Sequence, residues 1–304
     1  MKCYQYQRTI IKPVSCEGIG LHSGKRVNLK ICPAPPNHGI KFTRSDLPNT
    51  PCIHAHFNQV VDTSLATVIG AEGCIVSTIE HLMAAFSGFA IDNALVQIDS
   101  YELPILDGSA GPFTELIKSA GIREQKSPRH YFVITAPIEI NQDGKSVAIY
   151  PDLKYKITCT IDYSHPIIGL QTLTLPIEER SFEQEICRAR TYGFLNELEY
   201  MQKYGLAKGG SLNNAVVLGQ DCVLNEDGLR YPDEFVRHKV LDCIGDFSLL
   251  GMPIIGHVIA VRSGHAFNHA FLEKFFKEKS SWETKTAHEL TAGTLDHPLN
   301  QIAV

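Results

Sequence analysis

Two segments far apart in the chain carry side chains whose types and spacing could bind a metal ion. On a helix, His238 and Asp242 would stand one turn apart on the same face, and two side chains at that spacing can hold one ion. His81 could supply a third ligand from the first half of the chain. Two histidines and one carboxylate, with a fourth position open to water, form a catalytic zinc arrangement. We therefore expect a metal site where the two halves meet, which is a common place for pockets.

Glu80, immediately before His81, offers a carboxylate that need not bind the metal and could take a proton from water. A second interpretation is structural, because residues 77–80 match a helix capping box in which the Glu80 side chain accepts the backbone N–H of Ser77. The pattern is not HExxH, since Glu80 precedes the histidine and no second histidine follows four residues later. Both interpretations of Glu80 stay open from the sequence.

The expected helix around His238 is mainly apolar, but a polar stripe runs along it at four-residue steps. The stripe consists of Glu234, His238, Asp242 and Asp246. Such a stripe suits a solvent-exposed face or a ladder of ion pairs as well as a metal site. Spacing alone does not decide among these three.

Composition is that of an ordinary globular protein. The 304 residues are 44% hydrophobic and 20% charged, and the net charge of −5 argues against binding nucleic acid by general phosphate attraction. No apolar run approaches the roughly 18 residues of a membrane helix, and the N-terminus lacks a signal-peptide hydrophobic region. The nine cysteines are scattered without a CxxC pair, which favours reduced thiols and a cytoplasmic location over disulfides or cysteine metal ligands.

The two halves of the chain repeat one plan. Each begins with strand, turn and strand (residues 4–33 and 131–151), continues with a helix that leads through glycine into a strand, and closes with a second helix. The helices are expected at 78–87 and 110–120 in the first half and at 234–250 and 266–279 in the second, and the strands that follow the first helix at 93–98 and 254–261. Similarities in the same order predict a duplicated α+β unit.

The predicted domains are residues 1–125 and 130–304, joined by the polar stretch 123–129. The second domain carries an insertion near 193–212 with apolar residues at a helical spacing. The stripe is Phe194, Leu195, Leu198 and Met201. It could belong to the core, or it could wall a channel for an apolar substrate tail.

Long motifs in the chain resemble UDP-3-O-acyl-N-acetylglucosamine deacetylase, the zinc enzyme family that commits the lipid A pathway of Gram-negative envelopes. The motifs are GIGLHSGK (18–25), DTSLAT (62–67), STIEHLMAA (77–85), IDN (91–93), ELPILDGSAGPF (102–113), RARTYGF (188–194), LNEDGLRYPDEFVRHKVLDCIGD (224–246) and SGHAFNHA (263–270). The resemblance runs in order from about residue 5 to 275.

This resemblance implies a role for each matching residue. His81, His238 and Asp242 would hold one zinc ion, Glu80 would be the general base, and His265 would be a second catalytic group paired with Asp246. Thr191 would help to hold the oxyanion, and Lys239 would lie near the nucleotide phosphates. The remaining substrate contacts implied are His22, Tyr192, Phe194, Gly210, Ser211 and Gly264. Tyr192 departs from the phenylalanine expected at its position.

The resemblance also implies the fold and the reaction. Two similar α+β domains would pack their helices between two sheets, with the zinc ion in the cleft between them. The reaction would convert UDP-3-O-(3-hydroxyacyl)-N-acetylglucosamine to the free amine and acetate, and a monomer is expected. Two alternatives remain: a zinc amidohydrolase for another N-acyl sugar, against which the insertion and Lys239 argue, and a non-catalytic metal-stabilised binding protein, against which Glu80 and His265 argue.

Overall fold

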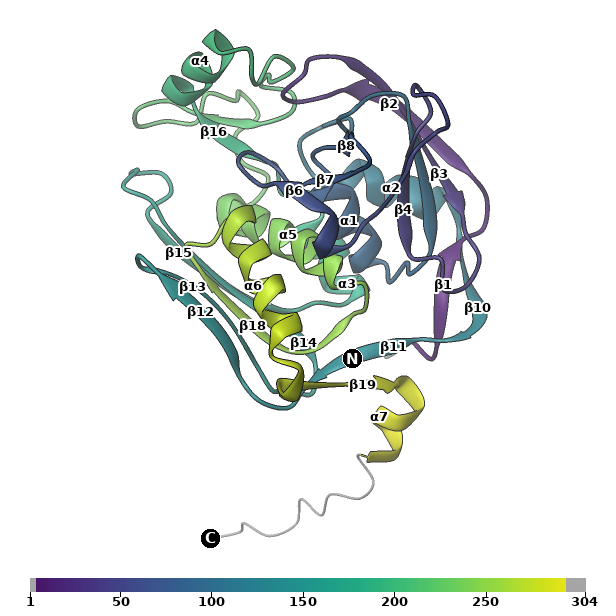
Figure 1. Ribbon diagram of the computed structural model, residues 1–304. Coiled ribbons are helices and arrows are strands. Elements are labelled where there is room, and N and C mark those ends of the chain that lie inside the picture. The colour runs from purple at the N-terminus through teal and green to yellow at the C-terminus, as the bar shows by residue number, and fades with distance from the viewer. Residues whose placement is uncertain (1–3, 294–304) are drawn as a thin grey trace, which may run out of the picture.

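The computed structural model of the protein describes residues 4–293 and contains two main sheets with helices between them (Figure 1). The first sheet has, in spatial order, β2 (Val14–Ile19), β3 (Arg26–Pro33), β9 (Ala94–Ile98), β4 (Ile40–Arg44) and β5 (Cys52–His54). The second contains β12 (Ile138–Gln142), β13 (Lys145–Tyr150), β18 (Ile254–Val261), β14 (Tyr155–Asp162) and β15 (Leu170–Pro176), and β18 also pairs with β11 (His130–Ile134).

The same strand pairing occurs in both sheets. In the first, β9 pairs antiparallel with β3 and parallel with β4. In the second, β18 pairs antiparallel with β13 and parallel with β14. The order β2-β3-β9-β4-β5 therefore corresponds to β12-β13-β18-β14-β15, which confirms the predicted duplicated α+β unit. The division into domains 1–125 and 130–304 we keep as a proposal, and residues 294–304 lie outside the described chain.

Alternating side chains hold each sheet against the helices. In β3 the side chains of Val27, Leu29 and Ile31 are buried while those between them face solvent. In β14 every second residue from Tyr155 to Ile161 is buried in the same way. Successive strand residues point to opposite faces, so this pattern gives each sheet one apolar face for the helices to cover.

Two layers of helices fill the space between the sheets. The central helices are α1 (Glu80–Gly88) and α5 (Glu234–Phe247), which pack against each other, and the outer ones are α2 (Gly111–Ala120) and α6 (His265–Lys277). The predicted helices are confirmed with ends that differ by a few residues. The end of the predicted helix 234–250 is a separate 3-10 turn, Ser248–Leu250.

The stretch predicted as a linker is a paired strand. Residues 122–128 form strand β10 (Ile122–Pro128), which pairs antiparallel with β1 (Tyr6–Ile10). The polar composition misled the prediction because alternate side chains of β10 face solvent. The chain thus passes from the first unit to the second through a paired strand.

Smaller elements complete the described chain. A three-stranded sheet of β6 (Val60–Asp62), β7 (Val68–Ala71) and β8 (Cys74–Val76) precedes α1. The insertion contains α4 (Leu195–Lys203), and the strands on either side of it, β16 (Tyr192–Phe194) and β17 (Val216–Leu218), pair with each other. The short helical segments α3 (Glu179–Ser181) and Phe182–Ile186 follow β15, and β19 (Trp282–Thr286) pairs with β11 before α7 (Ala287–Gly293). None of the helices within 4–293 has the length and apolar character that crossing a membrane requires.

Candidate active site

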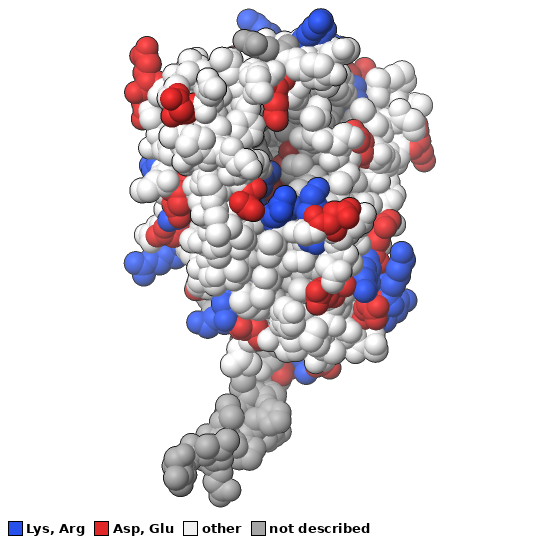
Figure 2. Space-filling model, turned by 90° about the vertical axis from the view of Figure 1, so that its left-hand side faces the viewer, with Lys and Arg blue, Asp and Glu red and all other residues white. Residues whose placement is uncertain are grey.

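A cavity of about 580 Å³ lies where the first turn of α1 meets α5, and both halves of the chain line it. Figure 2 views the molecule from the side of α4 and β15 and shows a hollow in that face with lysine and arginine side chains beside it. Of the predicted site residues, the following line the cavity: His22, Glu80, His81, Thr191, Tyr192, His238, Lys239, Asp242, Gly264 and His265. The structure thus brings these residues from both halves of the chain together in one cavity.

The start of α1 places Glu80 in this cavity, and the capping-box interpretation of Glu80 is wrong. The helix begins at Glu80 after Ile79, without a hydrogen bond from a capping side chain. The backbone N–H of Ser77 donates to the carbonyl of Tyr101 (2.8 Å) and not to Glu80. The Glu80 carboxylate is buried and accepts the backbone N–H of Thr67 at Oε2 (3.1 Å). Its other oxygen is left to face the cavity.

The polar stripe on α5 is buried throughout, so its interpretation as a solvent-exposed face is wrong. Glu234, His238, Asp242 and Asp246 are all less than 5% exposed. Glu234 accepts hydrogen bonds from the backbone and side chain of Arg190, which lies outside the helix, at 2.9 Å each. Because burying a carboxylate without a partner is costly, each member of the stripe requires a specific contact.

Three of the predicted ligands converge on one point. Asp242 Oδ1 lies 3.4 Å from His238 Nε2 and 3.9 Å from His81 Nε2, and all three atoms lie within 4.8 Å of one another. In a tetrahedral zinc site with bonds of about 2.0–2.1 Å, neighbouring ligand atoms are about 3.3–3.4 Å apart. The Asp242–His238 separation matches that geometry, and the two imidazoles would have to move closer to a bound ion, since the three atoms are spread over as much as 4.8 Å.

The hydrogen bonds around these ligands also suit a cation. Asp242 Oδ1 is buried and has no hydrogen-bond partner among the described residues, while Lys239 donates to the other oxygen, Oδ2 (2.9 Å). His238 Nδ1 lies 3.0 Å from the carbonyl oxygen of Ala189. That carbonyl can only accept, so the proton sits on Nδ1 and the lone pair of Nε2 points at the site, as in metal-binding histidines.

The charge states of the three residues fit metal binding as well. Burial lowers the pKa of His81 to about 3, and burial also lowers the pKa of His238. Burial alone would raise the pKa of Asp242, but the neighbouring His238 and Lys239 hold it below its ordinary value. Two neutral imidazoles and an ionised carboxylate are the protonation states that bind a divalent ion.

Glu80 and His265 face each other across the cavity next to these ligands. His265 Nε2 lies 3.9 Å from Glu80 Oε1, and His265 Nδ1 is hydrogen-bonded to Asp246 Oδ2 at 2.9 Å. Burial raises the pKa of Glu80 to about 7. Burial would lower the pKa of His265, but the carboxylate of Asp246 raises it to about 10. The pair can therefore serve as a proton acceptor and a proton donor in the same cavity.

The other predicted contacts fall into separate places. The Tyr192 hydroxyl donates to the Tyr163 hydroxyl (3.1 Å), and Phe194 lines a different cavity of about 640 Å³ together with Tyr163. The backbone N–H of Thr191 is already bonded to the carbonyl of Gly108 (2.8 Å), so only its side chain is available to the cavity. Gly210 and Ser211 line neither cavity and form part of the turn after α4. Their roles stay predictions.

Two buried polar residues that organise the site were not predicted from the sequence. Thr67, 3% exposed, contacts Glu80, Asp246 and His265. Glu102 is fully buried and accepts the backbone N–H groups of His22 and Ser23 at 2.8 Å each, which fixes the turn beside the cavity. Both lie inside motifs quoted above, and a polar residue within an apolar segment was the available signal.

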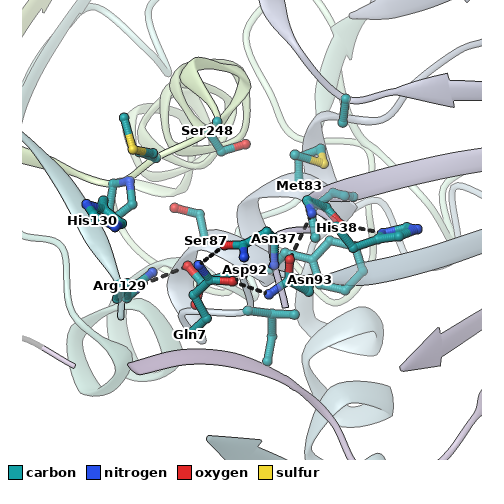
Figure 3. A pocket seen from close by; sticks show the side chains of 18 of the residues that line it. Gln7, Asn37, His38, Met83, Ser87, Asp92, Asn93, Arg129, His130 and Ser248 are labelled. Carbon is teal, nitrogen blue, oxygen red and sulfur yellow. Dashed lines mark hydrogen bonds and ion pairs between the residues drawn. The ribbon is translucent and has the colours of Figure 1, made fainter. Parts of the chain in front are cut away.

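A further cavity of about 340 Å³ lies at the opposite ends of α1 and α5, beside Ser87 and Ser248 (Figure 3). Its polar side chains bind one another: Arg129 is paired with Asp92 at 2.8 Å, and Asn93 donates to Gln7. In the part of the chain that the structure describes, His81, His238 and Asp242 form the single group of metal-ligating type. The candidate metal site therefore lies in the first cavity.

Comparison with known proteins identifies the family. A sequence model of the UDP-3-O-acyl N-acetylglycosamine deacetylase family matches residues 7–277. UDP-3-O-acyl-N-acetylglucosamine deacetylase of Myxococcus xanthus is 50% identical over 277 residues, which cover 91% of this chain and 88% of the relative. The enzymes of Syntrophus aciditrophicus (43% identical; 92% and 89% covered) and Coxiella burnetii (46%; 92% and 93%) are similar too. The match spans both units and every residue of the metal site and the Glu80–His265 pair, so the chain belongs to the UDP-3-O-acyl-N-acetylglucosamine deacetylase family.

Proposed function

We propose that this protein hydrolyses the N-acetyl group of UDP-3-O-(3-hydroxyacyl)-N-acetylglucosamine to the free amine and acetate, the committed step of lipid A biosynthesis, with one zinc ion held by His81, His238 and Asp242. One observation carries the proposal: three ligand atoms converge beside a facing carboxylate and imidazole, in a chain that matches this deacetylase family almost throughout. A purely structural metal site would not require the Glu80–His265 pair.

A zinc ion in this site would lower the pKa of a water molecule at its open position and polarise the acetamide carbonyl. Glu80 takes the proton of the attacking water. Its Oε2 is occupied by the Thr67 N–H (3.1 Å), so Oε1, on the cavity side, is the oxygen that accepts the proton. The raised pKa of Glu80, caused by burial, makes this carboxylate a stronger base than an exposed one.

His265 acts on the opposite side of the reaction. Asp246 raises the pKa of His265 to about 10, so the ring carries both protons: Nδ1–H donates to Asp246, and Nε2–H faces the cavity. We assign to this proton the stabilisation of the oxyanion and then transfer to the leaving nitrogen as the C–N bond breaks. The Thr191 side chain lines the same cavity and is our candidate for a second contact to the oxyanion. After product release, Glu80 gives its extra proton to solvent and His265 takes one back from solvent, which restores the starting state.

Substrate recognition uses the surroundings of the metal site. Lys239 and Lys145 line the cavity and are the cations available to the nucleotide phosphates. Phe194 and Leu195 line the neighbouring cavity of about 640 Å³, a site for an apolar acyl chain that the insertion would provide. A monomer in the cytoplasm is the state we expect from the sequence.

The purified chain should release acetate from UDP-3-O-acyl-N-acetylglucosamine with one zinc ion per molecule. Mass spectrometry of the product and metal analysis of the same sample test this. Faster turnover of an N-acyl sugar without the 3-O-acyl chain would favour the alternative amidohydrolase. A zinc-loaded chain that binds the substrate without releasing acetate would be a binding protein.

A further inference from the structure

Thr67 contacts both halves of the proton-transfer machinery at once. Its backbone N–H donates to Glu80 Oε2 (3.1 Å), and its hydroxyl donates to Asp246 Oδ1 (2.6 Å). The same hydroxyl oxygen lies 3.3 Å from His265 Nδ1. The side chain is buried, so water does not compete for these contacts.

The hydrogen bond from Thr67 to Asp246 belongs to the strong class. An O–H···O⁻ bond of about 2.5–2.7 Å is typical of a hydroxyl that donates to an ionised carboxylate. The other oxygen of Asp246 accepts from His265 Nδ1 (2.9 Å) and from Asn268 Nδ2 (2.8 Å). Thr67 and Asn268 therefore hold the carboxylate plane from its two sides, and that plane sets the direction of the His265 ring.

The position of Thr67 in the chain makes it suited to this role. It directly precedes β7, at the end of the segment 63–66, and residues 63–65 line the active-site cavity. Its carbonyl accepts the N–H of Ile79, just before the helix that carries Glu80. A displacement of Thr67 would therefore move the partner of Glu80 and the partner of Asp246 together.

We propose that Thr67 is a positioning residue that aligns the Glu80 and Asp246–His265 pairs with each other across the cavity. This inference rests on the proposed function. The N–H occupies one oxygen of Glu80, which leaves the other for the reacting proton, and the hydroxyl fixes Asp246 so that His265 Nε2 points into the cavity. Threonine is well suited because branching at Cβ restricts its side-chain torsion.

The decisive variants are Thr67→Val and Thr67→Ser. Valine keeps the backbone N–H and the shape but removes the hydroxyl, whereas serine keeps the hydroxyl. We expect Thr67→Val to lower kcat about 10–100-fold, a loss of the size typical when a hydrogen-bond partner behind a metal ligand is removed, with KM nearly unchanged and zinc fully bound. Thr67→Ser should recover most of kcat.

Thr9→Val is the matched control. Thr9 is also fully buried, and its hydroxyl donates to the carbonyl of Asn93 (2.7 Å), far from the cavity. This variant should lose thermal stability without a change in kcat. Equal losses of kcat in Thr9→Val and Thr67→Val would overturn the proposal, as would a Thr67→Val enzyme with normal kcat or one that has lost its zinc.

A second readout does not depend on turnover. In protein labelled with ¹⁵N-histidine, the Nδ1 proton of His265, assigned with His265→Ala, should give a downfield NMR signal that shifts or broadens in Thr67→Val and is retained in Thr67→Ser. An unchanged signal in Thr67→Val contradicts the positioning role. Absence of acetate release by the wild-type chain instead contradicts the proposed function, so the two failures are distinguishable.

Discussion

Gly245 in α5 packs directly against the backbone carbonyl of Glu80 in α1, and a Cβ atom at this glycine would overlap that carbonyl. The two central helices touch here backbone to backbone. The contact lies between Asp242 and Asp246 on one helix and beside His81 on the other, so it fixes how far Glu80 and His81 stand from the two aspartates.

Gly245→Ala should therefore damage the site as well as the fold. Overpacking typically costs about 1–3 kcal/mol, and here the obstructing atom is backbone, which cannot rotate away. We expect lower unfolding free energy, reduced zinc affinity and loss of turnover. Gly88→Ala is the control, because its Cβ would meet the ring of Phe182 at the other end of α1. It should destabilise the protein while zinc affinity stays normal, and equal zinc loss in both variants would contradict the local role of Gly245.

Removing any ligand should remove the metal. His81→Ala, His238→Ala and Asp242→Ala should each lose zinc and turnover, measured by metal analysis and acetate release. Asp233→Ala, which removes a carboxylate paired with Arg237 at the start of the same helix, should keep both. Full zinc occupancy in all three ligand variants would refute the site.

Chelation should lower the unfolding temperature of the wild-type protein. A ligand that binds only the folded state adds about 2.7 kcal/mol at a free concentration of 100 times its Kd. The shift should depend on the free zinc concentration and be absent in Asp242→Ala. Calorimetry with and without a chelator measures it.

Glu80→Gln should separate base chemistry from structure. Glutamine retains an oxygen that can accept the Thr67 N–H but cannot take a proton from water, so we expect zinc content and stability to stay near wild type while kcat falls about 10²–10⁴-fold. Ser77→Ala should change neither stability nor turnover much, because the Ser77 side chain makes no cap to the helix. A stability loss of about 0.5–2 kcal/mol in Ser77→Ala would restore the capping interpretation.

The pH dependence of kcat/KM should be bell-shaped. Glu80 must be ionised, so activity should rise with pH along the acid limb. Burial raises the pKa of Glu80 to about 7 without zinc, and the charge of a bound zinc ion should move this limb to lower pH. His265 must be protonated, and Asp246 raises its pKa to about 10 against the effect of burial, so activity falls above that pH. Asp246→Asn removes the raising charge and should move the basic limb to lower pH. A basic limb that stays in place would assign it to another group.

The same shift of His265 predicts a pH dependence of stability. A pKa raised from 6.5 to about 10 on folding contributes stability that is complete below about pH 6.5 and is lost as the pH rises through about 10. In zinc-free protein, denaturant unfolding between these limits should show this loss, and Asp246→Asn should reduce it. A flat stability profile in wild type would contradict the predicted shift.

Acyl-chain length should affect turnover through Phe194. Each methylene removed from water contributes about 0.8 kcal/mol, so Phe194→Asp should penalise long-chain substrates more than short ones. Tyr200→Asp is the control, since Tyr200 is 64% exposed. If the ratio of kcat/KM for long-chain to short-chain substrates is the same in wild type and Phe194→Asp, the apolar residues of the insertion serve only in core packing.

Local patterns in the sequence were sufficient to predict much of the fold and part of the candidate site. Helical spacing placed His238 and Asp242 together because residues four apart share a face whatever surrounds them, and the repeated strand and helix order predicted the duplicated unit. Spacing alone did not decide whether Glu80 is a general base or a helix-capping residue. It also did not decide whether the polar stripe on α5 is a solvent-exposed face or a metal site. The resemblance of the long motifs to a known family favoured the general base and the metal site. The substrate contacts predicted for the insertion stay predictions.

Only the tertiary structure decided which distant atoms meet. Polar composition at 123–129 indicated a linker, but pairing with β1 made it a strand, because hydrogen bonding to another segment overrides local preference. The start of α1 is held by the segments around Thr67 and Tyr101, and these replace the capping box that the local sequence matched. Thr67 and Asp246 are 179 positions apart, and neither carries a local signal for the other. Gly245 likewise lets α1 and α5 approach to backbone distance, and such an approach depends on the packing of the whole core.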